Sequence, residues 1–200
     1  SGISWGLIEA MRVVFPEKPF MELVHRLDRD TSGLLMVAEK RSVLRDLHDQ
    51  LREGRIRKTY VALLAGRLKG ATHTVNAPLH KGNLPNGERI VRVSRDGKEA
   101  LTEFRVLDRI GNATLVEASP KTGRTHQIRV HAQYLGHPLV GDEKYGNDDF
   151  NKAMKAHGVN RLFLHARDLR VKLNGAANYL NLTCPLEPDL EAVLEGLRRD

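Results

Sequence analysis

The residues best suited to do chemistry lie in one segment, residues 25–34, which reads His-Arg-Leu-Asp-Arg-Asp-Thr-Ser-Gly-Leu. It places the carboxylate of Asp28 between Arg26 and Arg29, at the end of an apolar run and the start of a tight turn. Positive neighbours keep a carboxylate ionised, and such a group could attack or stabilise a sugar carbon close to a phosphate backbone. The alternative is structural, because an aspartate before Thr-Ser-Gly commonly hydrogen-bonds the turn backbone, and Asp30 fits that role better.

A second cluster spans residues 121–131, Lys-Thr-Gly-Arg-Thr-His-Gln-Ile-Arg-Val-His. A glycine before a helix leaves backbone N–H groups free to attract an anion. Arg124 lies just before the expected helix and Arg129 in its first turns, where a planar guanidinium can pair with a carboxylate or a phosphate. A solvated basic helix is the alternative. His126 and His131 are five residues apart, which is poor spacing for a shared metal ion, so we expect no metal site.

Three further segments could contribute to a site. Tyr60, in the run 58–62, is a strand tyrosine of the kind that usually packs in a core, but its ring could also stack on a base. Leu162 and Leu164 lie in a core-like run, and either could wall a pocket. Arg89 and Arg92 form a basic flank that is either a solvated face or a set of phosphate contacts.

Composition narrows the partner and the compartment. The 200 residues include 32 Lys and Arg against 25 Asp and Glu, a formal charge of +7. Such a balance favours a polyanionic partner, although a protein that is simply basic would show it too. The single cysteine, Cys184, allows no internal disulfide and is expected to be a small buried residue. With no bilayer-length apolar run and no signal peptide, a cytoplasmic protein is expected.

The pattern of apolar residues and turn residues predicts strands that outnumber helices. We expect helices over residues 4–15, 42–54, 125–135 and 188–197. Strands are expected over 20–28, 34–38, 58–65, 163–173 and 179–184, with alternating strands and turns from 73 to 117. Residues 79–97 and 141–151 are expected to form surface loops. The first two strands would be joined by the turn at 31–33, with Arg26 and Asp28 on one strand face. No regular βαβ alternation is visible, so the expected fold is α+β with a mixed, mainly antiparallel sheet.

Five segments resemble, in order, the motifs of the RluA family of pseudouridine synthases. These are residues 25–34, 58–62, 122–131, 136–146 (Gly-His-Pro followed by Gly-Asp-Glu-Lys-Tyr-Gly) and 161–166. The resemblance implies that uridine in RNA becomes pseudouridine: the base is detached from its sugar, turned, and rejoined through carbon five. Finer details are most similar to members that act on 23S, large-subunit, ribosomal RNA.

The resemblance also implies roles for particular residues. Asp28 matches the catalytic aspartate, and Arg129 matches the basic residue that pairs with it. Tyr60 matches the tyrosine that stacks on the target base and takes a proton. Arg26 matches the arginine that displaces the base from its stack, and Leu164 is the candidate for the apolar pocket wall.

The implied reaction needs no cofactor, and no Walker loop or Gly-x-Gly-x-x-Gly motif is present. RNA, as ribosomal RNA or a pre-ribosomal particle, is the expected partner of a monomer that binds no membrane, with Arg89, Arg92 and Arg124 as further RNA contacts. A non-catalytic RNA-binding module and the same chemistry on transfer RNA are the alternatives. Residues 1–200 would form one catalytic domain that lacks the family's first strand, which carries a Lys-Pro motif, and an S4-like RNA-binding domain.

Overall fold

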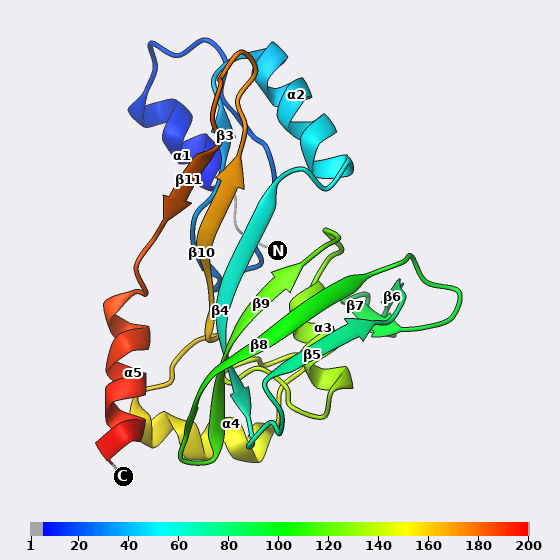
Figure 1. The fold of residues 1–200 in the computed structure, drawn as a ribbon, viewed down its shortest axis with the longest axis vertical. Helices are drawn as coiled ribbons and strands as arrows, with labels where there is room; N and C mark the ends of the chain where they lie inside the picture. The colour runs from blue at the N-terminus through cyan, green and yellow to red at the C-terminus, as the bar shows by residue number, and fades with distance from the viewer. Residues whose placement is uncertain (1–5, 200) are drawn as a thin grey trace.

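The structure, a computed structural model that describes residues 6–199, is organised around one long strand, β4 (Arg57–Ala65). β4 pairs antiparallel with β10 (Leu164–Val171) on one side and with β9 (Ala113–Pro120) on the other (Figure 1). Three antiparallel strands complete the order β11-β10-β4-β9-β8-β5: β11 (Leu180–Thr183), β8 (Leu101–Ile110) and β5 (Thr72–Asn76). The expected α+β class with a mixed, mainly antiparallel sheet is therefore confirmed.

Short strands and helices surround this sheet. β2 (Ser32–Gly33) pairs with β10 in parallel, while β1 (Glu22–Leu23) with β3 (Val37–Ala38) and β6 (Leu79–Asn83) with β7 (Arg89–Val93) form two small antiparallel sheets. The helices are α1 (Leu7–Val14), α2 (Arg41–Arg52), α3 (Gln127–Tyr134), α4 (Asp148–Met154) and α5 (Pro188–Arg199), with one 3₁₀ turn at Lys155–His157. Within residues 6–199, no helix is long and apolar enough to cross a membrane.

Side chains alternate between the two faces of β4, and an apolar cluster covers each face. One face carries Tyr60, Ala62 and Leu64 into an apolar cluster shared with α3. The other carries Val61 and Leu63 into a cluster shared with α5. Helices on both faces thus hold the central strand, and the residues at its exposed beginning are fixed in position.

Two smaller apolar clusters attach the outlying parts. In the first, α2 and the β1–β3 pair pack on the far end of β10, at the upper end of Figure 1. In the second, the β6–β7 hairpin packs on α3 through Val91, Val130 and Tyr145. These clusters place α2 and the hairpin on either side of the segment that leads into α3.

Several predicted elements need correction. The strand expected over 20–28 is observed only at Glu22–Leu23, and that over 34–38 only at Val37–Ala38. The two strands do pair with each other, as β1 with β3, but residues 24–36 connect them, and within this connection Ser32–Gly33 pairs with β10. Arg26 and Asp28 therefore share no strand face. The expected loop 79–97 contains the β6–β7 hairpin, since its strands pack on α3.

The ends of the chain also differ from expectation. The helix expected over 4–15 is observed as Leu7–Val14, with residues 4 and 5 outside the described part, and it has no buried residue, so its apolar side does not enter the core. Cys184 is only partly buried, because it follows the exposed edge strand β11.

Gly33 offers a direct test of how the segment before it is held. Its φ is +105°, and a Cβ there would lie 2.2 Å from the Ala166 carbonyl oxygen. We expect Gly33→Ala to lower the free energy of unfolding by at least about 3 kcal/mol, because the clash with backbone adds to the cost of a positive φ. Urea denaturation measures this.

Gly87→Ala is the matched control. Gly87 has a similar φ of +81° but nothing within 4 Å of its added Cβ. This variant should lose only about 1 kcal/mol, the cost of the backbone conformation alone. Equal losses in the two variants would show that the close approach to Ala166 contributes nothing.

Candidate active site

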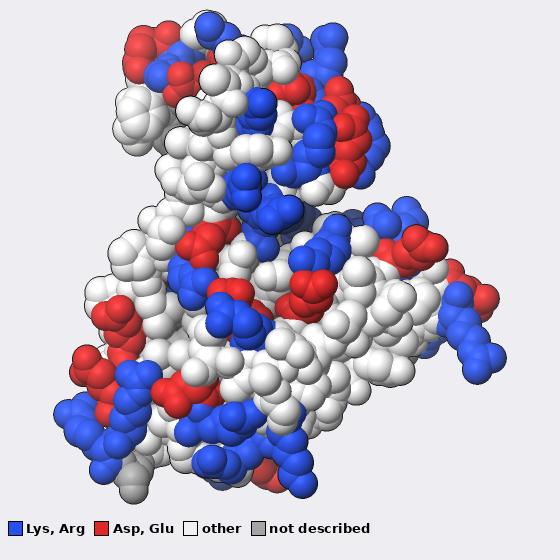
Figure 2. Space-filling model, viewed as in Figure 1, with Lys and Arg blue, Asp and Glu red and all other residues white. Residues whose placement is uncertain are grey.

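A cavity of about 540 Å³ opens between residues 25–31, the end of α2, the beginning of β4 and residues 120–129. Figure 2 shows the molecule hollowed between the part that carries α2 and the part that carries β8 and β9, with basic side chains gathered there. Asp28 is the one acidic residue among the described residues that line the cavity. Six basic residues line it as well: Arg26, Arg52, Lys58, Lys121, Arg124 and Arg129.

The backbone around Asp28 is held by the sheet. The Asp28 carbonyl accepts a hydrogen bond from the Thr31 N–H at 3.1 Å, which closes the turn. Beyond the turn, β2 pairs with β10, and Ser32 Oγ lies 2.9 Å from His165 Nδ1. Because His165 Nε2 faces the Cys184 carbonyl, which can only accept, Nδ1 accepts the Ser32 proton. The turn therefore presents Asp28 from a rigid support.

Arg129 joins Asp28 to a second, deeper carboxylate. Its Nη1 lies 3.3 Å from Asp28 Oδ2, whereas its Nε and Nη2 hold both oxygens of Asp142 at 2.7 and 2.8 Å. Asp142 is 1% exposed and also accepts the backbone N–H groups of Lys144 and Tyr145. Burial alone would raise the pKa of Asp142, but the bonds and charge of Arg129 outweigh it, so its pKa is lowered. A buried ion pair thus fixes the guanidinium that faces Asp28.

Tyr60 occupies a row of small residues across the sheet. It pairs with Ala166 on β10 and Ala118 on β9, and Ala166 pairs in turn with Gly33. These small neighbours leave room for the ring in the cavity wall. Burial, followed by the charge of Asp28, raises the pKa of Tyr60 to about 12. At neutral pH the side chain is therefore a neutral phenol beside an ionisable carboxylate.

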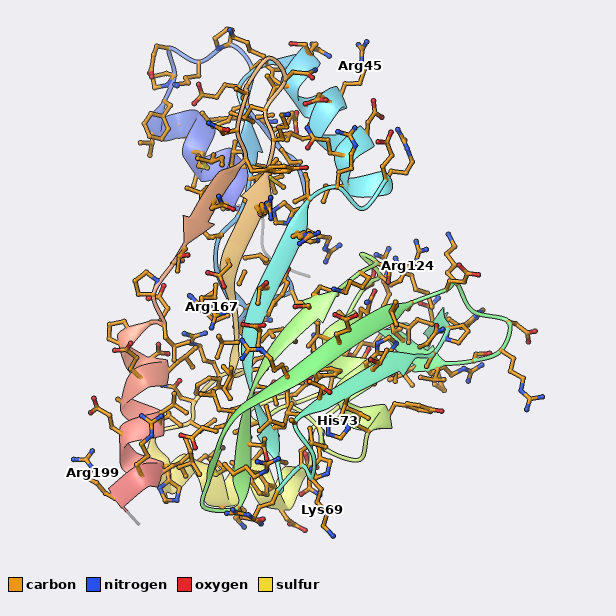
Figure 3. The ribbon with its side chains drawn as sticks, viewed as in Figure 1. Arg45, Lys69, His73, Arg124, Arg167 and Arg199 are labelled. Carbon is orange, nitrogen blue, oxygen red and sulfur yellow. The ribbon has the colours of Figure 1, made fainter. Side chains whose placement is uncertain are left out.

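The other residues singled out in the sequence divide into two groups. Arg26, Arg124 and Leu164 line the cavity with Asp28, Tyr60 and Arg129. Arg124 lies just beyond the end of β9 on the side that faces α2 (Figure 3), and its Nε donates to the Glu99 carbonyl at 2.9 Å. Arg89 and Arg92 are exposed on β7 and do not line the cavity. α3 begins at Gln127, so Arg124 precedes the helix.

Sequence reasoning missed several residues of this site. Lys58 lines the cavity, and burial lowers its pKa; its position two residues before Tyr60 on a strand was an available signal, because such residues share a face. Asp142 lay in a motif that the sequence displayed, but nothing local indicated its burial. For His126 the sequence pattern suggests no role beyond metal ligation, for which its spacing is poor. Among the described residues no group of three or more His, Cys, Asp or Glu could hold a metal ion.

The comparison with protein families agrees with the geometry. Residues 12–134 match the family model described as RNA pseudouridylate synthase. Because the match covers more than half of the chain, the chain belongs to this family, and the resemblance of its motifs to the RluA members is confirmed.

The curated relatives carry a more specific name. The chain is 50% identical over 200 residues to the Haemophilus ducreyi protein named ribosomal large subunit pseudouridine synthase C, and 52% identical over 198 residues to the Pasteurella multocida protein of the same name. The first match covers 100% of this chain and 62% of the relative, and the second covers 99% of this chain and 61% of the relative. The chain thus spans less than two thirds of the length of these two relatives. Among solved structures, human RNA Pseudouridylate Synthase Domain Containing 1 matches with a TM-score of 0.76 and 29% identity, over 92% of this chain and 76% of that one.

Proposed function

We propose that the chain is the catalytic domain of an enzyme that isomerises specific uridines to pseudouridine in large-subunit ribosomal RNA, with Asp28 as the catalytic residue. One observation carries the proposal: among the described residues that line the cavity there is a single carboxylate, and it faces Arg129 at 3.3 Å among five further basic residues. An RNA-binding surface has no need of a carboxylate near phosphates, whereas a reaction at the sugar of a nucleotide does. The names of the curated relatives support the substrate class.

The proposed reaction conserves every atom. The bond between C1′ of the ribose and N1 of the base breaks, a bond between C1′ and C5 forms, C5 loses a proton and N1 gains one. No redox change occurs. Asp28 acts either as a nucleophile or by removing a proton from the sugar, and both routes require an ionised carboxylate next to the ribose. Arg129 places a positive charge 3.3 Å from the carboxylate and orients it.

The walls of the cavity suit a base that has left its stack. Unstacking costs roughly a few kcal/mol, and an aromatic platform offsets part of that cost. Tyr60 supplies the platform, Leu164 the apolar wall, and exposed Arg26 lies at the cavity where it can replace the displaced base in the RNA. Because Tyr60 has a pKa of about 12, it enters the reaction as a protonated phenol. It can accept a proton only after it has given its phenol proton to a stronger base or to the RNA.

The test is direct. The protein is incubated with unmodified large-subunit ribosomal RNA and, separately, with unmodified transfer RNA, and pseudouridines are mapped in both. Formation at discrete uridines of the ribosomal RNA supports the proposal. Formation in transfer RNA alone would show that the substrate is transfer RNA and not ribosomal RNA. RNA binding without any pseudouridine would favour a non-catalytic module.

Arg89 and Arg92 should affect RNA affinity rather than chemistry. Both are exposed on the β6–β7 hairpin, outside the cavity. We expect the double change to alanine to weaken RNA binding and to reduce the slope of log affinity against log salt by about 1.4 to 1.8, since two phosphate contacts would be lost. Turnover at saturating RNA should stay within about twofold. Fluorescence anisotropy across a salt series measures the slope, and an unchanged slope would contradict the assignment.

A further inference from the structure

His126 is held in an unusual way beside the proposed catalytic carboxylate. Its φ is +53°, and Asp30 is the only other non-glycine residue with positive φ in the described part of the chain. Such a conformation costs about 1–2 kcal/mol for a residue with a side chain and marks positions that the surrounding structure determines. The imidazole side chain is 15% exposed, lines the cavity, and lies between Asp28 and Tyr145.

The hydrogen bonds of Tyr145 favour one tautomer of this ring. Tyr145 Oη accepts the Val91 N–H at 3.0 Å and lies 2.7 Å from His126 Nδ1. Among the described residues, Nδ1 is the acceptor that faces the phenol proton, so donation to Nδ1 is the arrangement in which the hydroxyl keeps a partner for that proton. Nδ1 of a neutral imidazole is then an acceptor, and the ring proton lies on Nε2. Burial lowers the pKa of His126, the charge of Asp28 opposes this, and Arg129 and Lys144 favour the neutral form.

Nε2 faces the oxygen of Asp28 that Arg129 does not contact. The distance from His126 Nε2 to Asp28 Oδ1 is 4.0 Å. Arg129 contacts only Oδ2, through Nη1, because its Nε and Nη2 are hydrogen-bonded to Asp142. One contact leaves the carboxylate free to rotate about its own axis. A donor toward each oxygen fixes its plane. Catalytic hydrogen bonds are often long in unliganded sites and shorten when substrate binds.

We propose that His126 is a positioning residue: as the neutral Nε2–H tautomer set by Tyr145, it orients Oδ1 of Asp28 while Arg129 orients Oδ2. The inference rests on the proposed function of Asp28. It also explains why the chain places histidine, and not glycine, at a left-handed position. The β6–β7 hairpin takes part through Val91, whose backbone N–H donates to the Tyr145 hydroxyl that faces the ring.

Two substitutions separate the two ring nitrogens. The amide of glutamine reaches the position of Nε2, whereas asparagine ends near Nδ1. Asparagine tolerates a positive φ better than glutamine does. We therefore expect His126→Asn to fold at least as well as His126→Gln but to lose about 100-fold in kcat, as a displaced catalytic group does. His126→Gln should stay within about tenfold of the wild type, and RNA affinity should be unchanged in both.

Imidazole nitrogen NMR tests the tautomer without any activity. The wild type should show a protonated Nε2 and a bare Nδ1 for His126, assigned by the signal that His126→Asn removes, and Tyr145→Phe should shift the ring toward a mixture of tautomers. A protonated Nδ1 in the wild type, equal kcat losses in the two His126 variants, or wild-type kcat in His126→Asn would each overturn the inference. An active Asp28→Ala protein would instead overturn the proposed function.

Discussion

The Asp28→Asn variant is expected to form pseudouridine at least about 10⁴-fold more slowly than the wild type, as enzymes do when a catalytic carboxylate is replaced. Asparagine keeps the shape of the side chain but is neither a nucleophile nor a base. The fold should be retained, with the free energy of unfolding within about 1 kcal/mol of the wild type. The reason is that Arg129 keeps its two bonds to Asp142 when it loses the 3.3 Å contact to Asp28. Single-turnover assays on unmodified ribosomal RNA measure the rate.

Asp30→Asn is the matched control for this experiment. Asp30 lies two residues further along the same turn, is exposed, and does not line the cavity. Its φ of +68° suits asparagine. This variant should turn over like the wild type. Pseudouridine formation by Asp28→Asn at a rate close to that of the control would remove Asp28 from the mechanism.

The residues of the site could be predicted from the ordered motifs along the chain, but not from the residues next to each of them. Taken alone, an aspartate before Thr-Ser-Gly is better explained as a turn residue, and the structure does close a turn on the Asp28 carbonyl. Only the matching motifs connected Asp28 with Arg129, which is 101 residues away in the sequence, and the structure brings them to 3.3 Å. The catalytic role of each remains a proposal.

The parts that could not be predicted depend on contacts between distant segments. Residues 31–33 carry turn residues, but nothing local shows that Ser32 and Gly33 also pair with β10, where Gly33 closely approaches Ala166. Asp142 is an ordinary loop aspartate in sequence, and nothing local shows that it is buried against the guanidinium of Arg129. His126 was expected inside a helix, whereas its backbone is left-handed and the helix begins one residue later.

Arg129→Met should cause the largest loss of stability among single changes in the site. Methionine keeps most of the apolar stem but leaves the carboxylate of Asp142, which is 1% exposed, without a cation. Removing one partner of a buried ion pair typically costs about 3–5 kcal/mol. Asp28 would also lose its cation, so kcat should fall by about 100-fold or more. Urea denaturation and single-turnover assays give the two quantities.

The stability loss should depend on pH in a defined direction. In the wild type the pKa of Asp142 lies below its ordinary value of 3.8, so the stabilisation is complete above about pH 4 and is lost as the pH falls through the lowered pKa. In Arg129→Met the same buried carboxylate has no cation, and its pKa rises. As the pH falls, Asp142 is therefore protonated first in the variant, which removes the unpaired buried charge, while Asp142 of the wild type is still ionised and paired with Arg129. The difference in unfolding free energy should therefore be smaller at pH 5 than at pH 7.

A second change separates the structural from the catalytic contribution of Arg129. In Arg129→Met combined with Asp142→Asn, no buried charge is left unpaired, and the asparagine oxygen can still accept the backbone N–H groups of Lys144 and Tyr145. Most of the lost stability should return, because the cost lay in the uncompensated charge. Turnover should stay low, since Asp28 still lacks its guanidinium. If the double variant recovered wild-type turnover, Arg129 would serve only to neutralise Asp142, and Asp28 would need another source of its orientation.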